Sequence, residues 1–199
     1  MITFDEVDIY LLNKWHDISK LQNAINSLNN KMKGFIEEIV SGLKDREWWD
    51  KRQFGEPYVT RKMQIGIGKK SWIIGPDQKW DHVSIWIEPF DLDNLLGISD
   101  RPIAGIWTSR LGVQQTDFNK VFNQETKEIR EKMKATMDFK DLDDEEYSFG
   151  YYLPQTPSQW IEILEVGKFV ETILQNFDNL AKFIDPVSRA LSAVGKIKK

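Results

Sequence analysis

The residue types that most often carry catalysis are scarce in this chain. It has no cysteine and only two histidines, His16 and His82. Cysteine catalysis, disulfides and thiolate metal sites are therefore excluded, and a histidine-rich zinc site is hard to build from two separated rings. Asp81 cannot orient His82 as a general base, because neighbouring strand residues point to opposite faces of a sheet. No Gly-x-Ser-x-Gly motif is present for serine catalysis. These patterns predict no catalytic residue, no metal and no other cofactor.

Two segments resemble ligand-binding loops without completing the pattern. Residues 66–71 (GIGKKS) look like a phosphate loop, but Lys70 stands where a serine or threonine should follow the lysine. A tight hairpin turn explains these glycines without a ligand. Residues 91–94 (DLDN) begin like a calcium loop, yet two leucines follow where an oxygen ligand and a glycine are needed. We interpret Asp91 as a helix cap.

Carboxylates in the middle of the chain support one enzymatic alternative. The expected order of elements, with a helix, three strands, a helix and a further strand, resembles the order in restriction-endonuclease-like folds. Those folds hold magnesium between an aspartate and a Glu-x-Lys motif. Asp77 and Glu88 are suitably placed, with Asp81 nearby. However, proline and phenylalanine follow Glu88, so the lysine of the motif is missing. The resemblance is one of order only, and a shared fold does not establish a shared activity.

A basic segment rich in aromatic residues spans 44–70. It carries eight lysines and arginines against four acids, with two tryptophans, a phenylalanine and a tyrosine between them. Single-stranded nucleic acid or a phosphorylated ligand uses such a combination of cations and rings. The interpretation that we favour is simpler: the tryptophans close a helix against a sheet, and the charges face water. The candidate partner-binding residues are Trp48, Trp49, Arg52, Arg61, Lys62, Lys69 and Lys70.

Composition limits the remaining classes of function. The net charge of -4 argues against a protein that coats nucleic acid without specificity. No apolar run is long enough to cross a bilayer, so we expect no membrane partner. The first residues lack the basic and apolar stretches of a secretory signal, which predicts a cytoplasmic protein. The eight tryptophans indicate buried anchors in a core or an interface.

Both ends of the chain carry apolar residues at heptad spacing. This spacing is typical of helices that pack along their length on other helices, either within the chain or in a second copy. The front series is Ile18, Leu21, Ile25, Leu28, Met32, Phe35 and Ile39, and the back series runs from Ile163 to Leu191. The residues expected to make this packing are Ile18, Ile25, Leu28, Met32, Phe35, Val170, Ile173, Phe177 and Leu180.

The first of these helices is expected over 8–49. A straight rod of that span would be roughly 60 Å long, whereas a domain of this size has a radius of gyration of only about 16 Å. The helix therefore either breaks or projects and pairs with a second copy. The expected break points are Asn29-Asn30, Gly34 and Gly42.

Two-residue alternation predicts antiparallel strands over 58–110. The strand that ends at Ile67 is expected to return through a hairpin over 71–74, followed by a turn at 75–77. A strand over 80–88 would place Val83, Ile85 and Ile87 on the core face. The last strand, 103–109, is expected at a sheet edge or a bulge.

The second half of the chain alternates helices with one strand. A helix is expected over 117–136, followed by an acidic linker over 138–146 and an aromatic strand over 147–153. A long helix over 157–192 then opens with Thr156 and Gln159 as a capping box. Asp185-Pro186 is expected to kink or interrupt this helix, because proline lacks an amide proton.

Together these elements predict a single α+β domain over 1–199. An antiparallel sheet of about four to five strands is flanked by long N- and C-terminal helices, with one further helix in the middle. We expect a non-catalytic protein–protein interaction module that self-associates through its long helices as a homo-oligomer. An inhibitor-, immunity- or antitoxin-like role fits such a module. We also expect a protein partner, whose identity the sequence does not indicate. The alternative is a nucleic-acid-binding or metal-dependent nuclease-like protein.

Overall fold

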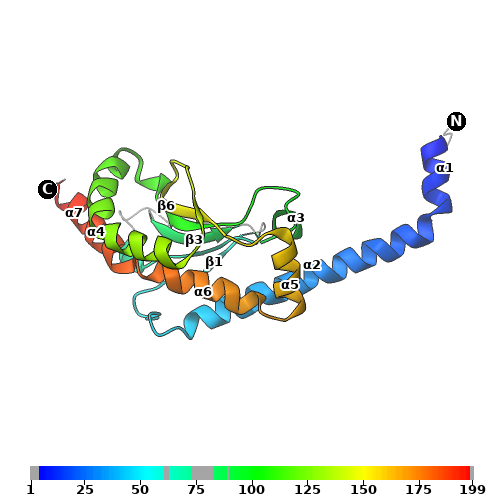
Figure 1. Ribbon diagram of the computed structural model, residues 1–199, viewed down its shortest axis with the longest axis horizontal. Coiled ribbons are helices and arrows are strands. Elements are labelled where there is room, and N and C mark those ends of the chain that lie inside the picture. Colours follow the sequence, from blue (N-terminus) through cyan, green and yellow to red (C-terminus); the bar gives the residue numbers. More distant parts are fainter. Residues whose placement is uncertain (1–4, 61–62, 73–82, 89, 198–199) are drawn as a thin grey trace.

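The computed structural model describes residues 5–60, 63–72, 83–88 and 90–197, with side chains of the last helix described as far as Val194. The chain starts with α1 (Glu6–Asn13) and α2 (Trp15–Lys44), which reach far beyond the rest of the molecule (Figure 1). The other elements are, in chain order, β1 (Tyr58–Val59), β2 (Ile65–Ile67), η1 (Lys70–Trp72), β3 (Ser84–Glu88), α3 (Leu92–Leu95), β4 (Ile103–Trp107), η2 (Ser109–Gln114), α4 (Gln115–Thr136), β5 (Lys140–Asp141), β6 (Tyr147–Tyr152), α5 (Pro157–Glu165), α6 (Phe169–Ala181) and α7 (Ile184–Ile197).

Six strands form one antiparallel sheet in the order β1-β2-β3-β4-β6-β5. This confirms the α+β class and corrects the expected number of strands from four or five to six. The edge strands β1 and β5 are two residues long, which is too short for alternation to show in the sequence. β4 was expected at an edge and lies between β3 and β6 instead, but the expected bulge is present as a register shift between Ile106 and Trp107.

The prediction of a hairpin over 71–74 is wrong for Ser71 and Trp72, the two of these residues that the structure describes. Ser71 and Trp72 belong to the short helix η1, and β2 pairs with β3 instead. The Trp72 side chain is 1% exposed, and its Nε1 donates to Ser188 Oγ on α7 at 2.9 Å. Burial of this large ring therefore directs the chain toward α7 rather than back along the sheet. The turn expected at 75–77 and the start of the strand expected at 80 lie outside the described residues.

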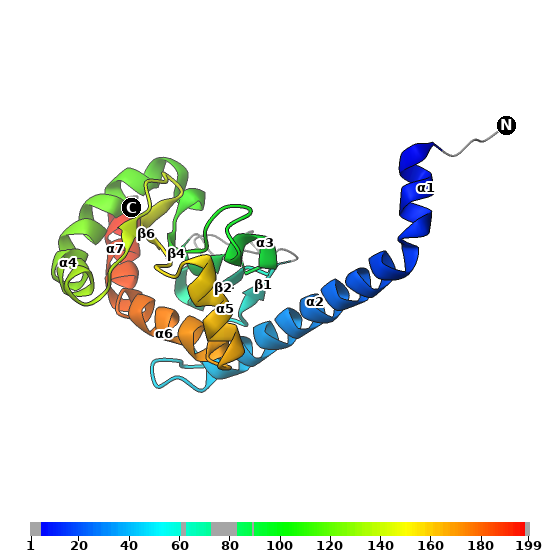
Figure 2. The same cartoon turned by 45° about the vertical axis from the view of Figure 1, so that its right-hand side comes forward.

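Helices cover one face of the sheet, with α6 running beneath the strands (Figures 1 and 2). The hydroxyl of Tyr151 on β6 donates to Asn176 Oδ1 on α6 at 3.0 Å. The rings of Phe149 and Phe183 stack with their centroids 4.7 Å apart. The strand residues that point to this side are fully or almost fully buried: Ile65, Ile67, Val83, Ile85, Ile87, Ala104, Ile106, Phe149 and Tyr151. The alternation predicted for Val83, Ile85 and Ile87 is thereby confirmed.

The first helix breaks at Lys14, not at any of the expected sites. Lys14 separates α1 from α2, and α2 continues without interruption to Lys44 rather than to residue 49. Asp5 forms a capping box with Asp8 and starts α1 there. Gly42 does not break α2 because it serves close packing: a Cβ there would lie 2.6 Å from Leu174 Cδ1 on α6. The expected projection is present together with the break, since α1 and the first part of α2 extend beyond the rest of the molecule (Figure 1).

The long C-terminal helix is divided into three. Its start is as expected, since Thr156 and Gln159 form the capping box of α5. α5 ends before Gly167, whose φ of +68° is a left-handed conformation that favours glycine. The second interruption, at Lys182-Phe183, comes before the expected Asp185-Pro186. Pro186 lies in the first turn of α7, where a missing amide proton has no cost.

The middle of the chain follows the prediction closely. α4 agrees with the helix expected over 117–136 to within two residues, and β6 agrees with the strand expected over 147–153. The acidic segment 138–146 is not only a linker, because it contains β5, which pairs with β6 through Lys140↔Tyr152 and Asp141↔Tyr151. Its acidic side chains flank an edge strand, and charge at such an edge opposes pairing with other chains.

Candidate functional site

Residues 6–28 of α1 and α2 form a projection that we call the arm. It extends away from the sheet and from the helices that cover the sheet (Figures 1 and 2). No residue of α1 is buried, and the first buried residue of α2 is Met32. The arm is therefore attached to the rest of the molecule at one end only.

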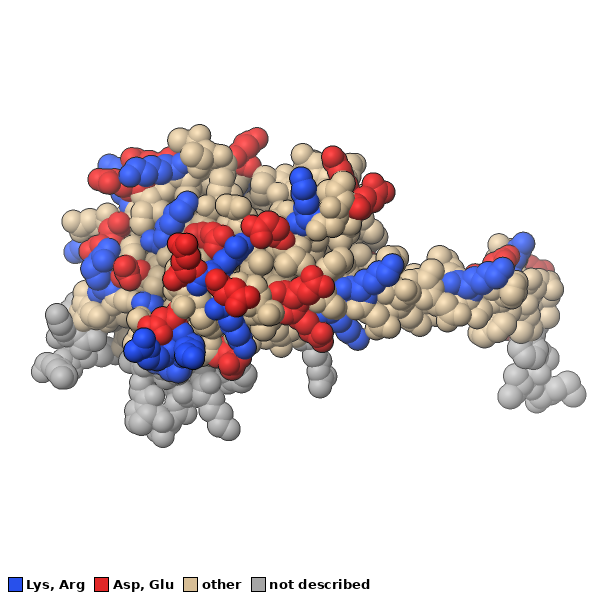
Figure 3. Space-filling model, turned by 90° about the horizontal axis from the view of Figure 1, so that it is seen from below, with Lys and Arg blue, Asp and Glu red and all other residues tan. Residues whose placement is uncertain are grey.

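Large apolar side chains are exposed along the arm. Of the fifteen large hydrophobic side chains that are exposed among the described residues, nine lie on the arm. The exposed fractions range from 39% at Ile25 to 64% at Val7 and Trp15. The nine are Val7, Ile9, Tyr10, Leu11, Leu12, Trp15, Leu21, Ile25 and Leu28. Figure 3 shows mostly uncharged surface along the arm on the side drawn. Exposed apolar side chains gathered in one region make the arm a candidate interaction surface.

The heptad stripe of α2 is covered along one half only. Met32 is 2% exposed, and the ring of Phe35 lies 5.4 Å from the ring of Phe169 on α6, measured between centroids. Ile25 is 39% and Leu28 48% exposed, and Ile18 is partly exposed. The spacing is the same in both halves. The predicted packing residues Met32 and Phe35 therefore pack within the chain, whereas Ile18, Ile25 and Leu28 remain accessible.

The second predicted stripe is part of the core. Ile173, Phe177 and Leu180 on α6 are 0% exposed, and Val170 is half-buried. They lie in the layer between the sheet and α2, to which Phe169 belongs as well. The back series thus packs against its own chain, and the projecting surface is confined to the front series and α1.

α1 contains exposed apolar residues that the heptad pattern did not reveal. Four consecutive apolar residues, from Ile9 to Leu12, distribute around a helix instead of forming one face. Only Leu11 follows the heptad spacing of the front series. When a helix is apolar on several sides and lies outside the core, its apolar side chains can be buried only if other segments pack against more than one of those sides. The run of four apolar residues was therefore the feature of the sequence that could have drawn attention to α1.

An apolar groove lies where the arm joins the body. Its volume is about 450 Å³, and it runs between α2 and the start of the sheet. Ile36, Val40, Val59 and Met63 supply its apolar lining, with Lys33, Glu37 and Thr60 at its polar margin. Val59 is 50% exposed. The groove lies along the part of α2 that follows the arm, and we treat the groove and the arm as the candidate functional site.

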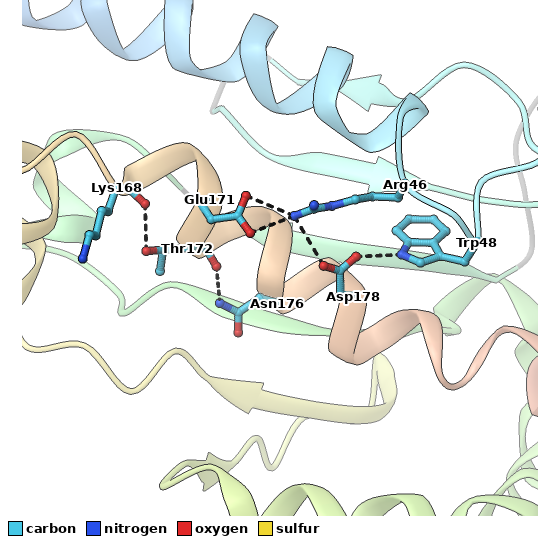
Figure 4. A network of polar contacts seen from close by, with 7 residues as sticks. All are labelled: Arg46, Trp48, Lys168, Glu171, Thr172, Asn176 and Asp178. Carbon is cyan, nitrogen blue, oxygen red and sulfur yellow. Dashed lines mark hydrogen bonds and ion pairs between the residues drawn. The ribbon is translucent and has the colours of Figure 1, made fainter.

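The tryptophans of the basic segment pack in the body, but against α6 and Phe54 and not, as the simpler interpretation expected, against the sheet. The ring centroids of Trp49 and Phe54 lie 4.7 Å apart, and those of Trp48 and Trp49 lie 6.0 Å apart. Trp48 Nε1 donates to Asp178 Oδ1 on α6 at 2.7 Å (Figure 4). These rings close the end of α2 against α6, so their packing needs no ligand.

Arg46 joins the same two helices through charge. Its Nη2 lies 3.2 Å from Glu171 Oε1 and 3.4 Å from Asp178 Oδ2, both on α6 (Figure 4). The Arg46 side chain is 25% exposed. This network fixes the direction in which α2 leaves the body, and α2 carries the arm.

The remaining cations of the basic segment are placed separately. Lys69 Nζ lies 5.9 Å from the centroid of Phe54 and 4.0 Å from Asp185 Oδ1. Lys70 Nζ donates to the carbonyl oxygen of Lys51 at 3.3 Å. Arg52 pairs with Asp50 at 3.6 Å and is exposed. Hydrogen bonds from the backbone of Arg52 and the side chain of Gln53 lower the pKa of Asp50. Arg61 and Lys62 lie outside the described residues.

The carboxylates of the nuclease alternative are only partly visible. Asp77, Asp81 and His82 lie outside the described residues. Glu88 lies on the face of β3 opposite the helices and accepts a hydrogen bond from the Tyr147 hydroxyl. Among the described residues no group of three or more His, Cys, Asp or Glu side chains is placed to hold a metal ion.

Two tyrosines of β6 are expected to make the stability of the fold depend on pH in alkaline solution. Burial, together with the neighbouring Glu88, raises the pKa of Tyr147, and burial raises the pKa of Tyr151. Tyrosines in the unfolded chain ionise near pH 10, so the unfolded state releases protons that the folded state keeps. Stability is therefore expected to fall above about pH 10 by about 1.4 kcal/mol per pH unit for each buried tyrosine. Urea unfolding between pH 8 and about 11, with absorbance of tyrosinate, measures this fall.

Tyr151→Phe is the control for this titration. It should reduce the alkaline slope, although it also removes the hydrogen bond to Asn176 and so lowers stability at neutral pH. An unchanged slope in the variant would contradict the assignment.

Comparisons of the chain with protein families, with curated proteins and with solved structures found no match. In the described part of the chain, no helix combines the length and the apolar character that crossing a membrane requires.

Proposed function

We propose that this chain is a non-catalytic protein–protein interaction module that self-associates through its arm. The observation that carries the proposal is the half-covered stripe of α2: one heptad series is buried against α6 from Met32 onward and exposed from Leu28 to Ile18. Apolar side chains at this spacing are stabilised by a facing helix of similar pattern. A second copy of the arm has that pattern.

An antiparallel arrangement fits the arm best. Two copies related by a two-fold axis would place Ile18 opposite the partner's Leu28, and Leu21 opposite the partner's Ile25. The bodies would then lie at opposite ends, whereas a parallel pair would bring both bodies to the same end. The acidic residues Asp5, Glu6 and Asp8 of the two copies would then lie at opposite ends of the pair, instead of facing each other as in a parallel pair.

The groove gives α1 a place in the same assembly. If the antiparallel alignment continues past Lys14, Tyr10 lies level with the partner's Ile36, and Val7 with the partner's Ile39. The groove lined by Ile36, Val40, Val59 and Met63 is beside these positions. The break at Lys14 allows α1 to tilt into it. Each copy would then cover both the stripe and the groove of the other.

The length of the arm is sufficient for a stable dimer. The arm contains the eight residues of α1 and fourteen residues of α2, together about 33 Å of helix, and a standard interface buries about 800 Å² on each partner. A membrane surface is a less suitable occupant, because helices that lie on anionic lipid carry lysine and arginine on the polar face. α1 has two acids in its first turn and no basic residue in its last.

Sedimentation equilibrium of the full chain tests the proposal. We expect a mass of twice 23.3 kDa at tens of micromolar, with a Kd of about 10 µM or tighter. A monomer at about 200 µM would reject self-association. Binding of the monomer to vesicles of phosphatidylcholine and phosphatidylglycerol would assign the arm to lipid and reject the second copy as its occupant.

A further inference from the structure

The face of the sheet opposite the helices has an aromatic floor of unusual construction. Gly66 on β2 and Gly105 on β4 both pair with Trp86 on β3, and Gly105 also pairs with Gly150 on β6. A Cβ at Gly66 would lie 2.6 Å from the Trp86 ring, and one at Gly105 would lie 2.7 Å from the ring of Tyr147. The row of glycines thus lets large rings lie down across the strands.

These rings form the base of two adjoining hollows that we call the trough. The first has a volume of about 430 Å³ and the second about 620 Å³, and both are lined in part by Gln64 and Glu88. The aromatic residues of the lining are Tyr58, Trp86, Trp107 and Tyr152. The trough is elongated, is lined by rings at its base, and lies on the side of the sheet away from α6.

Negative charge predominates in the described lining. Two carboxylates, from Glu88 and Glu146, line the first hollow, and Asp91, Asp100 and Asp144 line the second together with Glu88. Two arginines, Arg101 and Arg110, are the described cations of the lining. Phosphates and nucleic acid are disfavoured by this balance, and cationic groups are favoured.

The rings already bind cations of the same chain. Arg110 Cζ lies 5.2 Å from the centroid of Trp107, and Arg101 Cζ lies 5.7 Å from the centroid of Tyr152. Lys140 Nζ lies 5.8 Å from the centroid of Tyr152. Positive groups over aromatic faces at this range are attracted by the negative face of the ring. The rings of the lining are therefore placed where positive groups can lie over their faces.

We propose that the trough binds an aliphatic polyamine. The methylene segments of such a ligand would lie on the rings, and its ammonium groups would contact the rings and the carboxylates of the two hollows. The elongated shape and the two acidic hollows favour a ligand with separated positive charges over a single small cation. This inference is independent of self-association, because none of the arm residues lines the trough.

Isothermal titration calorimetry of the full chain with spermidine tests the proposal. We expect saturable binding with a Kd between about 10 µM and 1 mM at low salt, weakening as salt increases. Asp100→Asn and Asp144→Asn keep the shape of the side chain and remove its charge, and each should weaken binding by about threefold. Trp107→Leu removes a ring of the floor and should weaken binding by about fivefold or more.

Glu131→Gln on α4 is the matched control, since it removes one exposed carboxylate outside the trough. It should leave the Kd for spermidine unchanged. Equal weakening by this control would indicate nonspecific attraction to an acidic protein and would overturn the proposal. No binding heat up to about 10 mM spermidine would overturn it as well. Tighter binding of a neutral oligosaccharide, or binding of an oligolysine peptide in the absence of spermidine binding, would also reject a polyamine site. Circular dichroism spectra establish that each variant is folded.

Discussion

Replacing Leu21 and Ile25 together with glutamate should convert the proposed dimer into a monomer of 23.3 kDa. Both side chains belong to the exposed half of the α2 stripe, 63% and 39% exposed in the single chain. In the proposed antiparallel pair they face each other across the two-fold axis. Each substitution is therefore present in both copies at the same contact. Loss of apolar burial and repulsion between four carboxylates should cost at least about 3 kcal/mol, which is more than about 100-fold in Kd.

A matched control is available on the same helix. Asn23→Glu with Ser27→Glu adds the same charge at the same i, i+4 spacing, but on the opposite side of α2, where both residues are exposed. This variant should remain dimeric. Sedimentation equilibrium and thermal unfolding at low concentration distinguish the outcomes: both variants should keep the melting temperature of the isolated wild-type chain, because arm residues contribute little to the core. Equal dissociation of the two variants would contradict an interface built on the stripe.

Replacing Phe177 with alanine should lower the stability of the single chain and leave its self-association largely unchanged. Phe177 is 0% exposed at the centre of α6, between the sheet and α2, so the substitution leaves a cavity in the core. We expect a loss of about 3 to 5 kcal/mol in the free energy of unfolding, measured by urea denaturation at a concentration where the chain is monomeric. Gln175→Ala on the exposed side of the same helix should change it by less than about 0.5 kcal/mol.

The two experiments separate the two heptad series. If Phe177→Ala reduced association without a comparable loss of stability, the back series would belong to an interface rather than to the core. If Leu21→Glu with Ile25→Glu unfolded the chain, the arm would be part of the cooperative fold. The structure predicts neither, because α6 is enclosed by its own chain and α1 contributes no buried residue.

The carboxylates illustrate a limit of motif analysis. Glu88 was considered for its position relative to a metal motif, but its side chain accepts a hydrogen bond from Tyr147, which is fifty-nine residues away in the chain. Similarly, Gly66 was considered only as part of a possible phosphate loop, and only strand register shows that the glycines at 66, 105 and 150 lie in one row. Register depends on pairing between distant segments, and one-dimensional spacing does not record it.

Local features were determined by the sequence itself. The α+β order, the core side of β3 and the start of α5 at its capping box follow from periodicity and from hydrogen bonds within one or two turns, so they were predictable. The stripe of α2 was predictable for the same reason.

Only the tertiary structure decided what covers that stripe. The apolar pattern of Ile25 and Leu28 is the same as that of Met32 and Ile39, yet the body of the chain encloses only the second pair. Periodicity states that a helix has an apolar side, because side-chain directions repeat with the helical turn. Which segment packs against that side depends on where Arg46 and Trp48 tie α2 to α6 and on where α6 ends, and these are long-range contacts.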